Sequence, residues 1–341
     1  MTPGDSRYAR QVRFAGIGAA GQERLRGGRV LILGCGALGS AAADLLARAG
    51  VGHLTVVDRD VVEWTNLHRQ LLFDEADAAE GLPKAIAAAR ALARINSEVR
   101  VESVVADVRS DNVERLVAGA HVVVDGTDNL ETRYVLNDAC VKLGVPWVYG
   151  GAVAATGMAM AIVPGETACF RCLFPGDGGA GKMATCDTVG VLASTVVAVA
   201  AVQFTAVVKI LVGDREGLGE LVAFDVWTQD HEHTSVPRRP DCPCCVQHRL
   251  DYLDGRLTSR STTLCGQDAV QVSPATGLAL DLTKLAERLA GVGTVIFKAS
   301  VILRLAVGGH ELTVFPDGRA IVKGTGDPAV ARALYARYVG S

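Results

Sequence analysis

The chain has 341 residues, of which 49% are hydrophobic and 21% charged, so it can bury a substantial core and is not dominated by disorder. Its formal net charge of −3 provides no basic footprint for nucleic acid or for an anionic membrane. The N-terminal sequence MTPGDSRYARQ contains no apolar signal segment, and we therefore expect a cytoplasmic protein.

The first half of the chain alternates strand-like and helical patterns. Five runs predict buried parallel strands: RVLILG (29–34), HLTVVD (53–58), VRVESVVA (99–106), HVVVDGT (121–127) and PWVYGG (146–151). Helices are predicted between them over 37–48, 83–96, with Pro83 at the first position, 111–118 and 129–143. This alternation favours an α/β fold with a doubly wound, mainly parallel, Rossmann-like sheet.

The pattern changes after Gly151. A strand-like stretch to Val163 precedes a glycine-rich loop over 174–186, a long uncharged run at 189–208, and a hairpin-like pattern over 219–236. The uncharged run is about as long as a bilayer-spanning helix. Its interspersed serine, threonine and glutamine residues instead favour a helix buried against a sheet or a partner subunit, and we expect no membrane segment.

The C-terminal part begins with a break in composition at RRPDCPCC, and the polar residues 247–263 predict a linker. Beyond it we expect a strand (264–272), a helix (281–290), two or three strands within 294–323 and a helix (327–339). This is a small α+β unit near the lower size at which domains fold alone. The expected domains are 1–250 and 251–341, the second of no assigned family.

A glycine turn opens the first helix of the parallel region. Gly34, Gly36 and Gly39 form GxGxxG after a strand, where glycine allows close approach of a phosphate and the helix N-terminus supplies N–H donors. Asp58, at the end of the next strand, can accept from ribose hydroxyls. The pattern predicts a nucleotide site but does not choose between NAD and ATP, and a tight turn without ligand is the simpler alternative.

Charged residues beyond the glycine turn favour a triphosphate. Arg69 lies in a loop, and Lys84 lies in a helix first turn, where a positive charge costs about 0.3–1 kcal/mol unless an anion is nearby. Asp128, in TDN after a strand, is expected at the same carboxyl edge of the sheet. Two cations and a carboxylate around one nucleotide indicate ATP with Mg²⁺. A solvated surface lysine is the alternative for Lys84.

Four of the nine cysteines form two CxxC pairs, Cys169 with Cys172 and Cys242 with Cys245. Four thiolates predict a closed, tetrahedral and therefore structural Zn²⁺ site. A redox pair and unpaired buried thiols are the alternatives. Cys244 offers another ligand, but Cys242 and Cys245 keep the CxxC spacing.

The remaining cysteines have other predicted roles. Cys186 lies in the glycine-rich loop, where Lys182 favours its thiolate, and a loop residue without covalent chemistry is the alternative. Cys35 and Cys140 are interpreted as packing residues. A role in the core of a strand is favoured over sulfur transfer for Cys265.

The motifs taken in order resemble the ubiquitin-activating-enzyme-like superfamily, most closely its bacterial MoeB/ThiF/HesA branch, over about residues 7–247. They are RYARQ (7–11), the glycine turn, AGVGHLTVVDRD (49–60), NLHRQ (66–70), PK (83–84), GTDN (126–129) and the two CxxC pairs. The resemblance implies a homodimeric adenylyltransferase that uses ATP to activate the C-terminal glycine of a small ubiquitin-like sulfur carrier ending in Gly-Gly. The acyl adenylate prepares a thiocarboxylate for molybdopterin, thiamine or another sulfur-carrier route.

The resemblance also implies roles by position. Asp58 would bind the ribose, and the phosphates would be bound by Asn66, Arg69 and Lys84. Asp128, beside Asn129, would bind Mg²⁺. Arg10 would reach the phosphates in the partner subunit's site. The implied nucleotide-binding set further includes Gly34, Gly36, Ala37, Gly39, Asp60 and Gln70; relatives often have glycine where Ala37 stands. In relatives a cysteine at the place of Cys186 can form a thioester or a persulfide-linked adduct. Residues 251–341 do not resemble a rhodanese domain, so a separate protein is expected to donate sulfur.

Three other functions compete with this interpretation. An NAD-dependent oxidoreductase would account for Gly34 to Asp58 but not for the later motifs. A nucleotide-sensing scaffold would bind ATP without exchanging pyrophosphate. Within the superfamily, an activating enzyme could form a thioester between Cys186 and a ubiquitin-like modifier.

Overall fold

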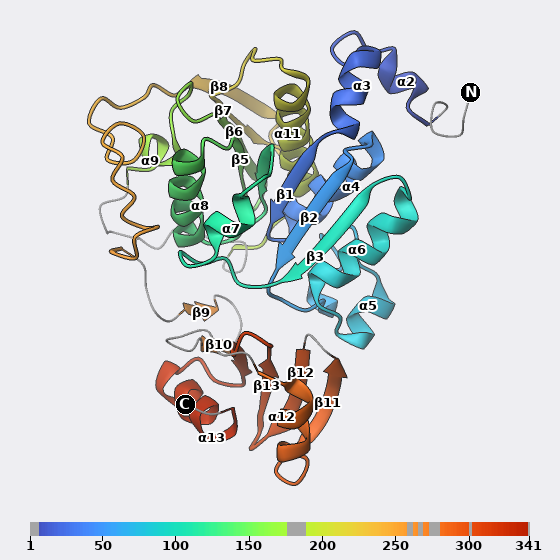
Figure 1. Ribbon diagram of the computed structural model, residues 1–341, viewed down its shortest axis with the longest axis vertical. Coiled ribbons are helices and arrows are strands. Elements are labelled where there is room, and N and C mark those ends of the chain that lie inside the picture. Colours follow the sequence, from blue (N-terminus) through green and yellow to red (C-terminus); the bar gives the residue numbers. More distant parts are fainter. Residues whose placement is uncertain are drawn as a thin grey trace. The chain divides into compact units, whose positions relative to one another are not determined.

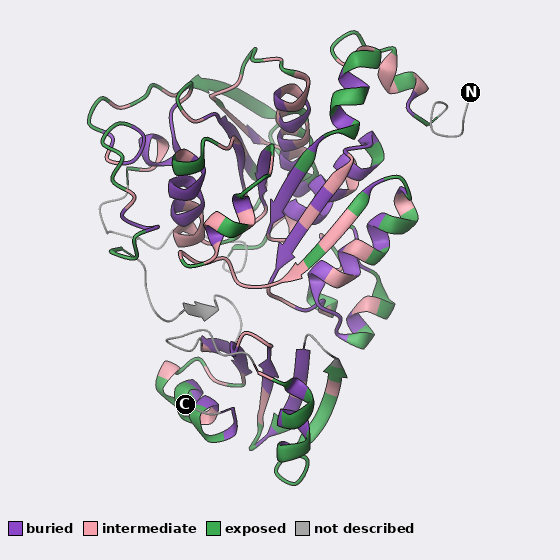
Figure 2. Cartoon of the chain, in the orientation of Figure 1, coloured by how far each residue is buried: buried purple, intermediate pink, exposed green. Residues whose placement is uncertain are grey.

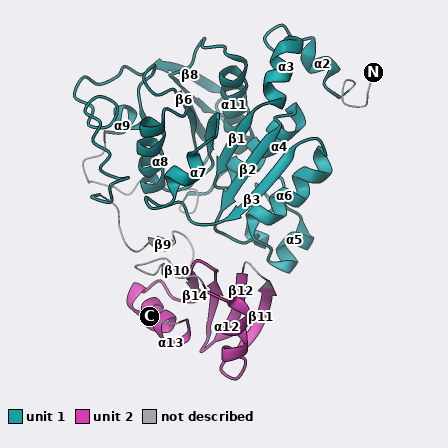
Figure 3. Ribbon diagram, in the orientation of Figure 1, with its two compact units in different colours: residues 1–257 teal, residues 258–341 magenta. Residues whose placement is uncertain are grey.

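The computed structural model describes residues 7–175, 189–257, 262–264, 269–272, 280–299 and 302–339. The chain divides into two units, residues 1–257 and 258–341 (Figure 3). This division falls close to the expected boundary between residues 250 and 251. Each unit has its own sheet and its own hydrophobic core.

Unit 1 contains an 8-stranded sheet with the order β3-β2-β1-β4-β5-β6-β7-β8. Its strands are β1 (Arg29–Leu33), β2 (His53–Asp58), β3 (Arg100–Val105), β4 (Val122–Asp125), β5 (Trp147–Val153), β6 (Thr156–Ile162), β7 (Glu220–Asp225) and β8 (Asp230–Ser235). The strands from β3 to β5 in this order are parallel, and β6, β7 and β8 continue the sheet in antiparallel pairs. The predicted doubly wound, mainly parallel sheet is confirmed, as is the hairpin expected over 219–236.

Helices cover both faces of this sheet (Figure 1). The helices described in unit 1 are α2 (Ala9–Val12), α3 (Gly18–Arg26), α4 (Ala37–Ala49), η1 (Trp64–Asn66), α5 (Glu75–Glu80), α6 (Lys84–Ile95), α7 (Val113–Val117), α8 (Leu130–Leu143), α9 (Phe170–Leu173) and α11 (Ala193–Val212). Helices α4, α6 and α11 pack on one face, and α7 and α8 cover the other. Leu31 and Leu33 of β1 belong to the core beneath α7 and α8. The central strands are apolar on both faces because both are covered, and Figure 2 shows them buried.

Helix α6 starts one residue later than expected, because Pro83 is its N-cap and Lys84 its first residue. Helix α11 is also displaced toward the C-terminus from the expected 189–208. Val191 pairs with Ala154 in an isolated β-bridge, which keeps the chain extended before the helix, and Gly213, with φ 84°, ends it. By length and composition alone α11 could cross a membrane, which is weak evidence, and it packs against α4, β4, β5 and β6.

The prediction of a linker over 247–263 is wrong for its first part. Residues 251–253 are buried in unit 1, and the Tyr252 ring stacks on Tyr134 with 4.4 Å between ring centroids. The buried Asp138 of α8 accepts hydrogen bonds from the backbone amides of Tyr252 and Leu253 at 3.0 and 3.3 Å. The surrounding polar residues mask this short apolar anchor in the sequence.

Unit 2 is an α+β unit, as expected. Its 6-stranded sheet has the order β11-β12-β13-β14-β10-β9. The elements are β9 (Thr262–Leu264), β10 (Ala269–Val272), α12 (Leu282–Leu289), β11 (Thr294–Ala299), β12 (Ile302–Val307), β13 (His310–Val314), β14 (Ala320–Lys323) and α13 (Pro328–Tyr338). The single strand expected over 264–272 is wrong, because β9 and β10 are separate and antiparallel. Residues 294–323 likewise form β11 to β14 rather than two or three strands.

The backbones after β1 and β4 approach each other so closely that only glycine fits. Gly34 has φ 82°, and a Cβ there would lie 2.6 Å from the Gly126 carbonyl oxygen. A Cβ on Gly39 would lie 1.9 Å from the Gly34 oxygen. Gly36 differs, because its nearest neighbour would be the Gln70 Nε2 at 3.9 Å. Packing therefore explains Gly34 and Gly39 but leaves space beside Gly36.

Gly39→Ala should lower the free energy of unfolding by about 3 kcal/mol, since backbone atoms must move to admit the methyl group. Gly36→Ala should cost about 1 kcal/mol or less, as expected for alanine at a helix N-cap. Urea unfolding of the two variants measures the difference. Equal losses would contradict the close packing of Gly39 against Gly34.

Candidate active site and metal centre

The glycine turn lies where the order of strands reverses. Strand β1 is flanked by β2 on one side and by β4 on the other, and ligands of such sheets bind at the carboxyl ends of the strands at this point. The turn after β1, Asp58 at the end of β2 and the loop after β4 all lie at this edge. Helix α4 begins here at Ala37, and its N-cap Gly36 supplies no capping side chain. An anion beside Gly36 would meet the N-terminal N–H groups of α4.

Asp58 fixes the backbone of the glycine turn and of the residues after β2 at this edge. Its carboxylate is 7% exposed and accepts hydrogen bonds from the backbone N–H groups of Cys35 at 2.6 Å and Asp60 at 2.7 Å. Burial raises the pKa of Asp58, and the nearby Lys84 cation opposes this shift. The sequence suggested only a contact with ribose, whereas the structure gives Asp58 a second role in fixing the glycine turn.

Lys84 is buried in the first turn of α6. Its Nζ lies 3.4 Å from the Asp60 carboxylate, and its backbone N–H donates to the Asp60 carbonyl at 2.9 Å. Burial alone would lower the pKa of Lys84, but the surrounding carboxylates outweigh burial and raise this pKa. The carboxylates with the largest effect belong to Asp60, Asp58 and Asp128. The amine is therefore a charged group at neutral pH, and the interpretation of Lys84 as a solvated surface residue is wrong.

Arg59 is a second cation at this edge and was not predicted from the sequence. Its guanidinium lies 3.1 Å from the Asp107 carboxylate and 3.8 Å from that of Asp60. Burial opposes its charge, but Asp60, Asp107 and Asp128 raise the pKa of Arg59. The only signal in the sequence is its position in DRD, directly after a strand that ends at the carboxyl edge.

A buried ion pair fixes the loop after β4. Asp125 is fully buried and accepts from Arg133 Nε at 2.8 Å, from the Thr127 N–H at 2.9 Å and from the Thr127 hydroxyl at 2.6 Å. Arg133 also donates to the carbonyl oxygens of Thr127 and Gly150 at 2.6 and 2.9 Å. Neither residue was predicted to have a role, because the sequence does not show that Asp125 and Arg133 contact each other in the folded chain.

The loop fixed by this pair carries two predicted site residues. Asp128 is exposed at the carboxyl edge, as expected from its position after the strand. Asn129 is the N-cap of α8 and accepts from the Thr132 N–H at 2.8 Å. Asn129 therefore already has a structural partner, whereas the Asp128 carboxylate faces solvent.

The NLHRQ residues occupy the turn around η1. Asn66 is buried and accepts from the Glu63 N–H at 3.1 Å, so it caps this turn. Gln70 is also buried, and its Oε1 has no hydrogen-bond partner among the described residues. Its Nε2 lies beside the space at Gly36. Arg69 donates to the Thr65 carbonyl at 2.7 Å within its own turn.

Arg10 lies away from these residues. It is exposed on α2, and the neighbouring Gln11 donates to the Ala49 carbonyl at 2.9 Å. Ala49 ends α4 just before β2, so α2 lies at the amino ends of the strands (Figure 1). The structure thus separates Arg10 from the predicted nucleotide edge of its own chain.

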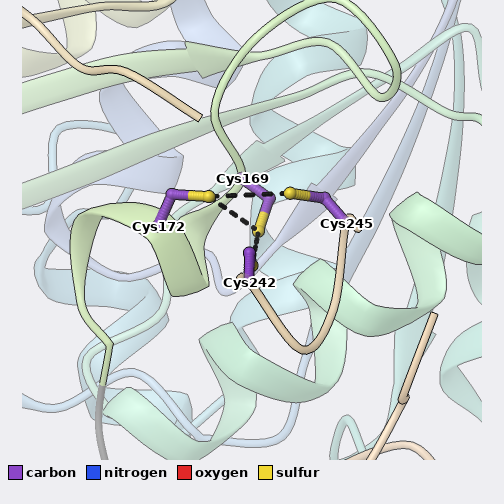
Figure 4. Close-up of side chains that lie close together, drawn as sticks. All are labelled: Cys169, Cys172, Cys242 and Cys245. Atoms are coloured by element: carbon purple, nitrogen blue, oxygen red, sulfur yellow. Dashed lines mark hydrogen bonds between the residues drawn. The ribbon is translucent and has the colours of Figure 1, made fainter. Parts of the chain in front are cut away.

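The four cysteines of the CxxC pairs come together, and all are buried. Their sulfur atoms lie within 4.8 Å of one another, and the close pairs are separated by 3.5, 3.6 and 3.9 Å (Figure 4). Zn–S bonds of about 2.3 Å in a tetrahedron place sulfur atoms about 3.8 Å apart. Both the donor set and its dimensions therefore suit a zinc ion.

Helix α8 supports the cysteine cluster through Asn137. The Asn137 Oδ1 accepts from the Phe170 N–H at 2.9 Å, and its Nδ2 donates to Cys244 Sγ at 3.2 Å. Cys244 accepts this hydrogen bond and is not one of the four cysteines whose sulfur atoms all lie within 4.8 Å of one another. Cys35 and Cys140 are buried, as expected for packing residues. Cys186 and Cys265 lie outside the described residues.

Comparison with known proteins identifies the family. Residues 8–244 match the ThiF family. The sulfur carrier protein ThiS adenylyltransferase of Bacillus subtilis (strain 168) is 38% identical over 338 residues, covering 98% of this chain and 99% of that protein. The SAMP-activating enzyme E1 of Haloferax volcanii is 41% identical over 249 residues, covering 73% of this chain and 91% of that protein.

A solved structure supports the same fold. Escherichia coli MccB crystallised with ATP superposes with a TM-score of 0.62 at 25% identity, covering 70% of this chain and 74% of MccB. The resemblance drawn from the glycine turn, NLHRQ, TDN and the cysteine pairs is thus confirmed at the level of the family. The family match covers most of unit 1, and the similarity to an adenylyltransferase covers nearly the whole chain. The chain therefore belongs to the ThiF family.

Proposed function

We propose that this protein uses ATP to adenylate the C-terminal glycine of a small ubiquitin-like sulfur carrier and releases pyrophosphate. The observation that carries the proposal is the buried Lys84 amine in a helix first turn beside the glycine turn. The surrounding carboxylates keep this amine charged, so it offers a fixed positive charge close to the N–H groups at the start of α4, where a polyphosphate would bind. Relatives named as sulfur-carrier adenylyltransferases and the ATP in MccB support the same reaction.

The proposed reaction needs no general base. The attacking group is a carboxylate, which is already ionised at neutral pH. Negative charge grows on the α-phosphate and on the departing pyrophosphate, so the enzyme must supply fixed positive charge and N–H donors there. Positive charge would come from Lys84, and N–H donors from the start of α4 at Gly36 and Ala37. Further contacts to the phosphates would come from the neighbouring turn, which carries Asn66, Arg69 and Gln70. Asp58 and Asp60 would orient the ribose and the lysine.

Asp128 is the proposed ligand for Mg²⁺. Its carboxylate is exposed at the edge, on a loop held by the buried Asp125–Arg133 pair, and carboxylate oxygens suit this hard cation. When bound, Mg²⁺ would neutralise charge on the phosphate oxygens. Asn129 would contribute by fixing the start of α8.

Arg10 is proposed to act in the site of a second subunit. Within its own chain it lies at the amino ends of the strands, so only another copy could bring it to the phosphates. The proposal therefore requires a homodimer in which each site is completed in trans. In another phosphoryl-transfer system, an arginine supplied by a partner is worth about 10³–10⁵ in rate.

A ThiS-type carrier is favoured over a MoaD-type carrier. The Bacillus subtilis relative, named for ThiS, matches 98% of this chain and therefore extends through unit 2, whereas the Haloferax volcanii relative matches 73%. We further propose that the protein acts in the cytoplasm and that a separate protein donates the sulfur for the carrier thiocarboxylate. Covalent participation of Cys186 stays a prediction, and the oxidoreductase alternative is not favoured by these relatives.

The four clustered cysteines are proposed to bind a structural Zn²⁺. Four protein thiolates leave no position for a water molecule, so the metal would join α9 to the 242–245 turn rather than take part in the reaction. Asn137 would hold both segments against α8.

Lys84→Ala should reduce carrier-dependent ATP–pyrophosphate exchange by about 10²-fold or more, because a fixed charge on the reacting phosphates is lost. Lys142→Ala is the matched control, since this exposed lysine of α8 pairs with Glu114 at 2.8 Å. Thermal unfolding checks that both variants are folded. Exchange within twofold of wild type by a folded Lys84→Ala protein would refute the role.

Cys169→Ser should lower the zinc content well below one ion per chain, measured by elemental analysis, and should lower the melting temperature. Loss of one thiolate opens the site and weakens its contribution to folding. Cys140→Ala removes another buried thiol of the same unit and should retain zinc. A full complement of zinc in Cys169→Ser would contradict the assignment.

A further inference from the structure

We propose that Tyr8 and Asn96 are positioning residues that hold α2 in place so that Arg10 reaches the second subunit. The inference rests on the proposed role of Arg10 in trans. Helix α2 has four residues and none of them is buried. So short a helix is not stable by itself, and its position must come from the residues that flank it.

Tyr8 precedes α2 and is the main anchor. The residue is 3% exposed, and its ring lies against Gly50, which caps the end of α4 with φ 79°. A Cβ at Gly50 would lie 2.5 Å from both Cζ and the hydroxyl oxygen of Tyr8. The ring therefore occupies the space that this glycine leaves, directly before β2.

Asn96 connects the anchor to two further helices. It is 1% exposed and caps the end of α6. Its Nδ2 donates to the Tyr8 hydroxyl at 2.8 Å and to the Ala47 carbonyl of α4 at 2.7 Å. Both amide hydrogens are thus used, and one side chain joins the segment before α2 to the ends of α4 and α6.

A second set of hydrogen bonds fixes the other end of α2. Gln11 Nε2 donates to the Ala49 carbonyl at 2.9 Å and to Gln22 Oε1 at 2.7 Å. Gln22 Nε2 donates to the same carbonyl at 3.0 Å. Both sets attach α2 to the C-terminal ends of helices whose N-termini form the nucleotide edge. The Arg10 side chain meanwhile stays exposed.

Two substitutions separate positioning from folding. Tyr8→Phe removes only the hydroxyl and keeps the ring against Gly50, whereas Asn96→Ala removes the hydrogen bonds to both the Tyr8 hydroxyl and the Ala47 carbonyl of α4. We expect exchange to fall about tenfold in Tyr8→Phe and about 10²-fold in Asn96→Ala, as when a catalytic group is displaced by about 1 Å. Tyr335→Phe, which removes a buried hydroxyl that donates to Gly318 in unit 2, should keep wild-type exchange.

Mixed dimers then show on which subunit the defect acts. An Asn96→Ala chain and a Lys84→Ala chain are co-expressed with different tags and purified through both. One of the two sites then combines an intact Lys84 with an intact α2, so exchange should return to about half of wild type per dimer. The same recovery is expected for Tyr8→Phe, and for Arg10→Ala, each with Lys84→Ala. Asn96→Ala paired with Arg10→Ala should not recover, since neither chain then supplies a working α2.

The outcomes distinguish the two proposals. Wild-type exchange in both Tyr8→Phe and Asn96→Ala would overturn the positioning role. So would failure of both to recover with Lys84→Ala while Arg10→Ala recovers, since the defect would then lie in the pocket of the same chain. If the mixed dimer of Arg10→Ala and Lys84→Ala does not recover exchange, Arg10 does not act in trans. The positioning role of Tyr8 and Asn96 is then wrong as well.

Discussion

A buried lysine in the first turn of α6 is the feature on which the rest of the site depends. Burial and the helix dipole both disfavour the Lys84 cation, and the carboxylates of Asp58, Asp60 and Asp128 keep it charged. Asp58 in turn fixes the glycine turn through the Cys35 N–H. The same carboxylate therefore shapes the backbone around the proposed phosphates and balances the cation that would bind them.

Helix α8 joins the two sites of unit 1. Its N-cap Asn129 and the first-turn residue Arg133 hold the loop of Asp128. Its middle carries Asn137, which contacts both cysteine segments. Asp138 fastens residues 252 and 253 to the same helix. Through Asn137, the segments that carry the cysteine cluster thus contact the same helix that holds the loop of Asp128.

Much of this arrangement follows from local sequence patterns. The apolar runs predict the strands, and the fixed direction of parallel strands then places Asp58 and Asp128 at one edge with the glycine turn. The two CxxC pairs likewise predict a cluster of four thiols. Local patterns do not predict the role of a residue whose contact is made by a residue elsewhere in the chain. The contacts between Asp125 and Arg133, Arg59 and Asp107, and Tyr252 and Tyr134 are of this kind. The position of α2 is of the same kind, because Asn96 lies far from Tyr8 in the sequence.

Adenylation of the carrier can be measured as the intact mass of a ThiS-type carrier ending in Gly-Gly after incubation with this protein, ATP and Mg²⁺. We expect a carrier species heavier by one AMP that forms only when ATP and the intact C-terminus are present. This species should be absent with Lys84→Ala. A carrier that stays unmodified while the wild-type protein binds ATP would contradict the proposed adenylation.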